Sequence, residues 1–305
     1  MSAISERQNE EIHVQQLRAQ RRLYDEVRIR KWTRIVGIVL INAIWIVIAI
    51  LKWQSELIVI CGSALFIVVD FLLKEFWQDP IHKKAAFVQE LFDCDVLDLK
   101  WKESLHGDPP AADEVARWAD RYDEKKYQKA PLQNWYSQKV DTIPLVYGRL
   151  CCIYSNIDWD VSLRMMYLRR FWLAILGCIL IIGVAIFFWG LTVVDKYWIF
   201  IASVLPFFRT GWNETVGNFK SIHNLKNIRS MINRKWNEVK DGKLDENELE
   251  QAARDWQNVI LRHRQLSPVL PGKYYLKTRP KQEADMNLSS GALADDIKNA
   301  LRPPK

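Results

Sequence analysis

The chain has 305 residues, of which 49% are hydrophobic, and a formal net charge of +7. Its apolar residues are bunched into blocks instead of recurring at the period of a water-soluble core, which argues against an ordinary pair of soluble domains. The charge excess, which is clearest at residues 209–240, favours attraction to an anionic membrane leaflet, with a ligand-binding role as the alternative. We predict no DNA or RNA polymer as a partner. The five cysteines show neither metal-ligand spacing nor a disulfide framework.

The first predicted element is an amphipathic helix within residues 1–34. Leu17, Leu23 and Val27 lie there among many charged residues. The segment is too long and too polar for the charged start of a signal peptide, so we expect the N-terminus to be retained.

Four apolar blocks follow as two pairs, at residues 35–51 with 57–73 and at residues 171–194 with 197–208. A helix needs roughly 20 residues to cross about 30 Å of hydrocarbon, so two blocks are a little short and the last is clearly short. The connections within each pair are so brief that each pair should form a hairpin. We therefore predict an all-α membrane protein with transmembrane hairpins over residues 35–73 and 171–215.

The remaining segments should lie together on the cytoplasmic side of the membrane. Lys and Arg cluster at the ends of the blocks that face residues 74–170 and the two termini, whereas the hairpin tips contain only Lys52 and Lys196. We expect a helical domain built from the N-terminal helix, from residues 74–170 and from residues 216–305. Within it, breaks are predicted at residues 107–110, 130–131 and 143–144, and the tail beyond Pro271 is predicted to be irregular apart from a short helix at residues 292–301.

Polar residues inside the predicted spans need a partner, because an unpaired charge in hydrocarbon is costly. Counted at about 1.5 Å per residue from the hairpin tips, Asp70 and Arg209 lie at the same depth, so an ion pair between them is the first hypothesis. A pair between Asp70 and Lys74, a tilt that brings Asp70 to the lipid headgroups, and a conducting role are alternatives. Asn42 and Asn213 complete this polar set, and Asn42 is expected to hold helices together.

Residues 237–248 imitate the second half of a calcium-binding loop, but Asn237 and Val239 lack the carboxylates that its first half needs. We expect instead that Asp245 caps the following helix and that Glu248 completes a capping box. The sequence contains no glycine-rich phosphate loop, zinc motif or nucleophile elbow, so we predict no enzymatic activity, no cofactor and no metal site.

Four strings, in their order relative to the spans, carry a family resemblance. They are RQNEE at residues 7–11, AQRRLYDEV at residues 19–27, SNIDWDVSLRMMY at residues 155–167 and RDWQNVILRHRQLSP at residues 254–268. Together they resemble the SMODS-associated four-transmembrane effectors of bacterial cyclic-oligonucleotide anti-phage (CBASS) systems, over most of the chain. The resemblance implies a pore-forming or membrane-disrupting effector of the bacterial inner membrane that acts in abortive infection once a cyclic oligonucleotide binds its cytoplasmic part. The distribution of Lys and Arg separately predicts that both termini are cytoplasmic.

Such a ligand needs cations for its phosphates and flat side chains for its bases. Within the matched strings, the candidate ligand-binding residues are Arg7, Arg21, Arg164 and Arg264 for the phosphates, and Tyr24, Trp159 and Tyr167 for the bases. Structural roles are the alternative: Trp159 and Tyr167 would pack beneath the third span, Arg164 would meet lipid phosphate, and Asp160 would pair with a neighbouring arginine. Because four helices rarely enclose a channel, we expect a homo-oligomer.

Two other functions remain open at this point. The first is a constitutive ion channel or transporter subunit, whose pathway Asn42, Asp70 and Arg209 would line. The second is a non-conducting membrane scaffold whose helical domain docks a protein partner.

Overall fold

The computed structural model describes residues 3–50, 56–128, 130–189, 197–241 and 245–301. These residues form helices and no strand, which confirms the prediction of an all-helical fold. In chain order, the elements are α1 (Ile4–Arg7), α2 (Glu11–Ile50), α3 (Glu56–Leu73), the π-helical turn η1 (Lys74–Gln78), α4 (Asp79–Leu97), α5 (Glu103–His106), α6 (Ala112–Ala119), the 3-10 turn η2 (Gln138–Thr142), α7 (Leu145–Trp189), α8 (Tyr197–Lys240), α9 (Glu246–Leu266) and α10 (Gly272–Ala300).

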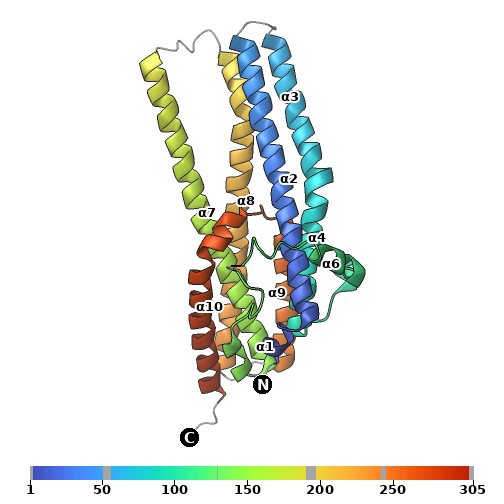
Figure 1. Ribbon diagram of the computed structural model, residues 1–305. Coiled ribbons are helices and arrows are strands. Elements are labelled where there is room, and N and C mark those ends of the chain that lie inside the picture. The colour runs from blue at the N-terminus through green and yellow to red at the C-terminus, as the bar shows by residue number, and fades with distance from the viewer. Residues whose placement is uncertain (1–2, 51–55, 129, 190–196, 242–244, 302–305) are drawn as a thin grey trace.

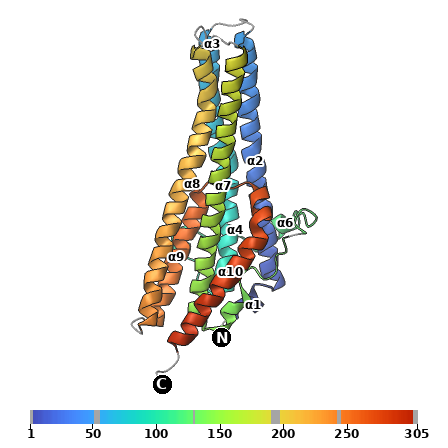
Figure 2. The same cartoon turned by 90° about the vertical axis from the view of Figure 1, so that its left-hand side faces the viewer.

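Four long helices, α2, α3, α7 and α8, rise from a thicker helical bundle at one end of the molecule (Figures 1 and 2). The first helix, α1, and the end of α10 lie at the bundle end, whereas the end of α2 and the start of α3 lie at the opposite end (Figure 1). The predicted N-terminal helix and the first predicted span are one continuous helix of 40 residues. Likewise, α7 runs without a break from the bundle into the third predicted span.

The membrane spans stay a prediction. Within the described ranges, no helix combines the length and the uninterrupted apolar stretch that a membrane span requires. Much of the predicted spans falls on residues 45–60 and 181–207, whose side chains lie outside the described part of the chain. The predicted hairpin connections, at residues 51–55 and 190–196, lie outside it as well.

The core of the bundle draws on three separate parts of the chain. Leu17 of α2, Leu150 and Ile157 of α7, Ile228 of α8 and Ile260 of α9 are each no more than 3% exposed and belong to one hydrophobic cluster. Burial of such side chains is the dominant favourable term in folding. The N-terminal, middle and C-terminal segments therefore pack as one unit, which brings residues far apart in the sequence to a common site.

The C-terminal tail differs from its prediction. The sequence predicts irregular chain beyond Pro271, but the structure has a single helix of 29 residues, α10, with Pro280 inside it. Pro280 is exposed, whereas Ala294 and Ile297 are 1% and 0% exposed and pack into the core of the bundle. The prediction was wrong because tertiary packing outweighs the low helix propensity of one exposed proline.

The predicted breaks of the middle segment all fall outside helices, and α5 is followed by Gly107 with a φ of 71°. The predicted cap of α9 is also confirmed, because the Asp245 side chain accepts a hydrogen bond from the Asn247 backbone N–H at 3.3 Å. Glu248 was expected to complete a capping box with Asp245. Its carboxylate instead lies 3.7 Å from the Lys235 Nζ atom.

Candidate functional site

A pocket of about 210 Å³ opens in the bundle where α2, α4, α7, α8, α9 and α10 meet. For scale, a cavity of about 150 Å³ in another protein holds benzene. The pocket wall combines four aromatic rings with four arginines. They are Tyr24, Trp135, Trp159 and Tyr275, and Arg28, Arg164, Arg264 and Arg279. Flat rings and guanidinium groups are the side chains that recognise nucleobases and phosphates, respectively.

Helical spacing brings the pocket residues of each helix to one face. Gln20, Tyr24 and Arg28 follow one another at intervals of four residues on α2, and all three line the pocket. Asp160 and Arg164 are related in the same way on α7. Since residues four apart lie on the same side of an α-helix, each of these helices presents a polar stripe to the pocket.

Each of the four pocket arginines already faces a carboxylate. The pairs are Arg28 with Asp25 at 3.0 Å, Arg164 with Asp160 at 3.0 Å, Arg264 with Asp93 at 2.6 Å, and Arg279 with Glu283. These guanidinium charges are therefore balanced before any ligand arrives. A ligand phosphate has to draw a guanidinium group away from its carboxylate or share it, so anion binding is linked to a rearrangement of these ion pairs.

Asp160 and Arg164 connect the pocket wall to α8 and to the chain between α9 and α10. The Arg164 guanidinium donates to Asn218 Oδ1 at 2.8 Å and to Ser267 Oγ at 2.9 Å. Asp160 also accepts a hydrogen bond from His263 Nε2 at 2.9 Å. Burial alone would raise the pKa of Asp160, but Arg164 and His263 hold this pKa well below its usual range. A ligand that engages Arg164 therefore acts directly on a contact with α8.

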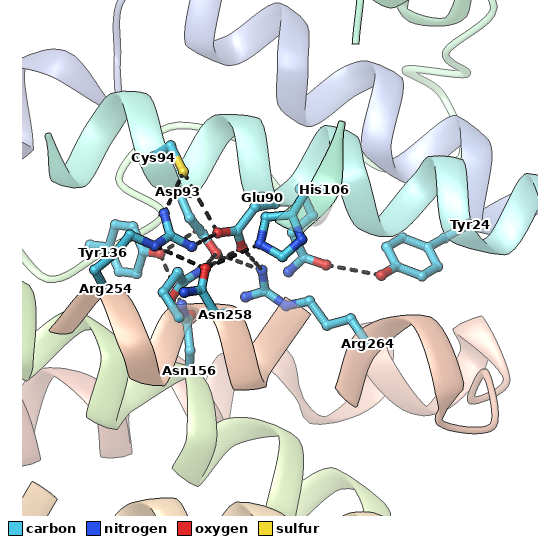
Figure 3. Close-up of polar contacts among 12 residues, drawn as sticks. Tyr24, Glu90, Asp93, Cys94, His106, Tyr136, Asn156, Arg254, Asn258 and Arg264 are labelled. Carbon is cyan, nitrogen blue, oxygen red and sulfur yellow. Dashed lines mark hydrogen bonds and ion pairs between the residues drawn. The ribbon is translucent and has the colours of Figure 1, made fainter. Parts of the chain in front are cut away.

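Arg264 also belongs to a buried ionic cluster that joins α4 to α9 (Figure 3). Glu90 is 0% exposed and accepts hydrogen bonds from Arg254 and, at 2.9 Å, from Gln257 Nε2. Asp93 accepts from Arg264 at 2.6 Å. Burial raises the pKa of Glu90, against the opposing effect of the charges on Arg254 and Arg264. The cluster pairs two carboxylates with two guanidinium groups, so it fixes α9, and with it Arg264, beside the pocket.

Two further pocket residues are neutral at pH 7. Tyr24 donates its hydroxyl to Gln89 Oε1 at 3.0 Å, and burial raises the pKa of Tyr24 to about 12. Burial lowers the pKa of His82 to about 4. A phosphate in this pocket would therefore find no positive charge on Tyr24 or His82, whereas the four arginines carry one each. Within the described ranges, no three His, Cys, Asp or Glu side chains are grouped so that they could hold a metal ion.

The structure brings four of the seven predicted ligand residues to the pocket: Tyr24, Trp159, Arg164 and Arg264. Arg164 is 5% exposed and hydrogen-bonded within the protein, so it is not available to lipid phosphate. Its pairing with Asp160 agrees with the structural alternative for that carboxylate.

The other three predicted ligand residues lie elsewhere. Arg7 belongs to the short helix α1. Arg21 is turned toward the backbone carbonyl of Ala130, to which it donates a hydrogen bond at 2.5 Å. Tyr167 donates its hydroxyl to Glu214 at 3.1 Å, and burial raises its pKa. These contacts give Arg21 and Tyr167 structural roles within the protein.

Asp70 has two arginine partners. Its Oδ1 atom accepts from Arg34 Nε at 2.9 Å and from Arg34 Nη2 at 2.6 Å, and its Oδ2 atom lies 3.6 Å from Arg209 Nη1. The predicted contact with Arg209 is thus present, but Arg34 makes the closer one. Lys74 pairs with Asp79 at 3.0 Å instead of with Asp70, which contradicts the local alternative.

The last two predicted polar residues are less informative. Asn42 is among the residues whose side chains lie outside the described part, and Asn213 is exposed on α8.

Four residues of the pocket and its ionic cluster were not predicted from the sequence: Gln20, Glu90, Asp93 and His263. Glu90 and Asp93 are three residues apart on a helix face that is otherwise apolar, and both are 0% exposed. Charged residues on such a face are a signal that could have indicated a buried ionic cluster. Gln20 and His263 carry no comparable signal, because only the packing of the helices brings them to the pocket.

The family model described as the SMODS-associating 4TM effector domain matches residues 2–292. The match covers the bundle, both predicted hairpins and most of α10. No curated protein and no solved structure matches the chain.

Proposed function

Because the chain belongs to the family of SMODS-associating 4TM effector domains, we propose that it is a CBASS anti-phage effector that a cyclic oligonucleotide second messenger activates. The observation that carries this proposal is the pocket, where four arginines and four aromatic rings converge. A cyclic oligonucleotide combines phosphates with flat bases, and recognition of both needs this combination of side chains. The proposed activity is permeabilisation of the bacterial inner membrane, without enzymatic chemistry.

The helices that line the pocket offer a route from ligand to membrane. Tyr24 and Arg28 lie on α2, and Trp159 and Arg164 lie on α7. Both helices continue beyond the bundle into predicted spans. A helix of about 40 residues is about 60 Å long. A small change of tilt at the pocket therefore becomes a larger displacement at the far end.

In this proposal, residues 35–73 and 171–215 form the membrane hairpins, and both termini are cytoplasmic. The position of α1 and of the end of α10 at the bundle end, far from the tips of α2 and α3, supports this orientation (Figure 1). Where the hairpins leave the bundle, Asp70 pairs with Arg34, and Lys31 pairs with Glu214 at 2.5 Å. Four helices rarely enclose a channel, so permeabilisation should require several copies or a reorganised bundle.

Dye release from liposomes tests the proposal. The purified full-length protein is reconstituted, and release is measured with a panel of cyclic di- and trinucleotides and without ligand. Release with one nucleotide only is the expected result, and Trp159→Ala should weaken it because loss of base stacking costs about 1–3 kcal/mol. Trp118→Ala is the matched control, since Trp118 is also partly buried but lies outside the pocket wall.

The other outcomes separate the rival functions. Release without any ligand would favour a constitutive channel, and no release under any condition would favour the scaffold; both results would overturn the proposed gating. Cross-linking that finds only monomer while the liposomes leak would overturn assembly.

A further inference from the structure

Gln20 presents a buried hydrogen-bond acceptor to the pocket. Its side chain lines the pocket and is only 5% exposed. Among the described residues, its Oε1 atom has no hydrogen-bond partner. An amide oxygen that is buried without a partner is unfavourable. Other buried side-chain atoms of the described residues also lack a partner, Gln16 Oε1 among them, but of the oxygen acceptors in that set only Gln20 Oε1 belongs to a residue of the pocket wall. The pocket, which is open to a ligand, is where a donor for this atom would come from.

The neighbouring polar groups of the pocket are already engaged. Tyr24, one turn further along α2, donates its hydroxyl to Gln89. Arg28, one turn beyond Tyr24, faces Asp25, and Arg264 faces Asp93. The carbonyl of Gln20 is therefore an acceptor that can receive a ligand N–H group without first breaking a contact within the protein.

We infer that Gln20 recognises an adenine base of the activating ligand, an inference that rests on the proposed function. A glutamine amide both accepts and donates, and adenine offers its N6 amino donor next to a ring-nitrogen acceptor. This bidentate pairing is the usual match between glutamine and adenine. Guanine offers two adjacent acceptors at the corresponding edge, so it has no donor there for the Gln20 carbonyl.

The pocket also supplies the surfaces on which a purine stacks. Trp159 on α7 and Tyr275 on α10 both line it, with ring centroids 6.2 Å apart. Stacking accepts any base, so by itself it does not select among ligands. The amide of Gln20 adds the selection, and recognition of one base then links α2 with α7 and α10.

Equilibrium binding to the full-length protein in detergent tests the inference by isothermal titration calorimetry. The probes are cyclic di-AMP and cyclic tri-AMP, their inosine counterparts, which carry a carbonyl in place of the N6 amino group, and cyclic di-GMP. The wild type should bind one adenine ligand at least about tenfold more tightly than its inosine counterpart. Gln20→Leu should weaken adenine binding by about tenfold or more and remove the preference over inosine.

The matched control is Gln16→Leu. Gln16 lies one turn earlier on α2 and is 4% exposed, but it donates to Asp95 at 2.7 Å and is not part of the pocket wall. This variant should keep the preference for adenine. The comparison of adenine with inosine ligands on the wild type needs no variant, so it remains decisive even if Gln20→Leu fails to fold.

Three results would overturn the role of Gln20 while leaving the proposed function intact. They are equal affinity of the wild type for adenine and inosine ligands, an unchanged preference for adenine in Gln20→Leu, and tighter binding of cyclic di-GMP than of either adenine ligand. If the wild type binds no cyclic oligonucleotide of any base, the proposed function fails as well, so the two failures are distinguishable.

Discussion

The substitution Arg254→Met tests whether the buried ionic cluster locks α9 onto α4. Arg254 is 4% exposed and donates hydrogen bonds to the Glu90 carboxylate and, at 3.0 Å, to Cys94 Sγ. Methionine keeps a long apolar side chain but offers no donor. Glu90 would therefore lose its closest cation while its side chain stays inside the protein.

The structure sets the expected magnitude. Removing one partner of a buried ion pair typically costs about 3–5 kcal/mol. Gln257 Nε2 at 2.9 Å and Arg264 at 3.7 Å would remain near the Glu90 carboxylate, which argues for the lower end of this range. At about 2 °C per kcal/mol for a chain of this size, a loss of about 3 kcal/mol lowers the Tm by about 6 °C.

Thermal unfolding of the purified protein in detergent, followed by far-UV circular dichroism, measures this loss. Arg254→Met combined with Glu90→Leu should recover most of it, because the double variant leaves no buried charge without a partner. The pH dependence gives a second check. Burial raises the pKa of Glu90, and loss of Arg254 should raise it further. The loss of stability in Arg254→Met relative to the wild type should therefore be largest above the folded-state pKa of Glu90. It should shrink as the pH falls through this pKa, because protonation removes the buried charge.

A Tm of Arg254→Met equal to that of the wild type would refute this reasoning. A double variant that is no more stable than the single variant would refute it as well, since the cost would then come from lost packing and not from an orphaned carboxylate.

Three further predictions concern other parts of the molecule. Asp70→Asn should raise ligand-free dye release from liposomes, and exchanging the charges with Arg34 should reverse the effect; unchanged basal release would contradict a locking role. Gly217→Ala should lower the free energy of unfolding by about 1–3 kcal/mol, because the added Cβ would lie 2.6 Å from Pro268 Cγ; an unchanged Tm would show that this contact yields. The depressed pKa of His82, from 6.5 to about 4, should cost the wild type about 3 kcal/mol of stability as the pH falls across that interval, and His82→Phe should lack this loss. If the stabilities of the wild type and of His82→Phe changed in parallel between pH 6.5 and 4, the last prediction would be contradicted.

Local features of the chain were predictable. Asp245 caps α9 and Gly107 follows α5 as expected, because capping and glycine conformations depend on residues close in sequence. Equal depth along two helices also indicated the contact between Asp70 and Arg209. The closer partner, Arg34, was not predicted, because its role depends on how α2 and α3 pack side by side.

For the pocket, the matched strings contain Tyr24, Trp159, Arg164 and Arg264, all of which line it. No local feature of the sequence distinguishes these four residues from the other three candidates. Tyr167, for example, has the right chemistry for a base but is turned toward Glu214. Side-chain chemistry can be read from the sequence, but the direction in which a side chain points depends on its neighbours in space.

By itself, the sequence determined most of the helical elements and many of the breaks between them, because helix propensity, capping and apolar spacing act over a few residues. Only the tertiary structure decided that the segment after Pro271 is helical and which carboxylate faces each pocket arginine. Asp93 and Arg264, for instance, are separated by 171 positions. Such pairs form where distant helices bury their charges together, and burial against remote parts of the chain leaves little trace in local sequence.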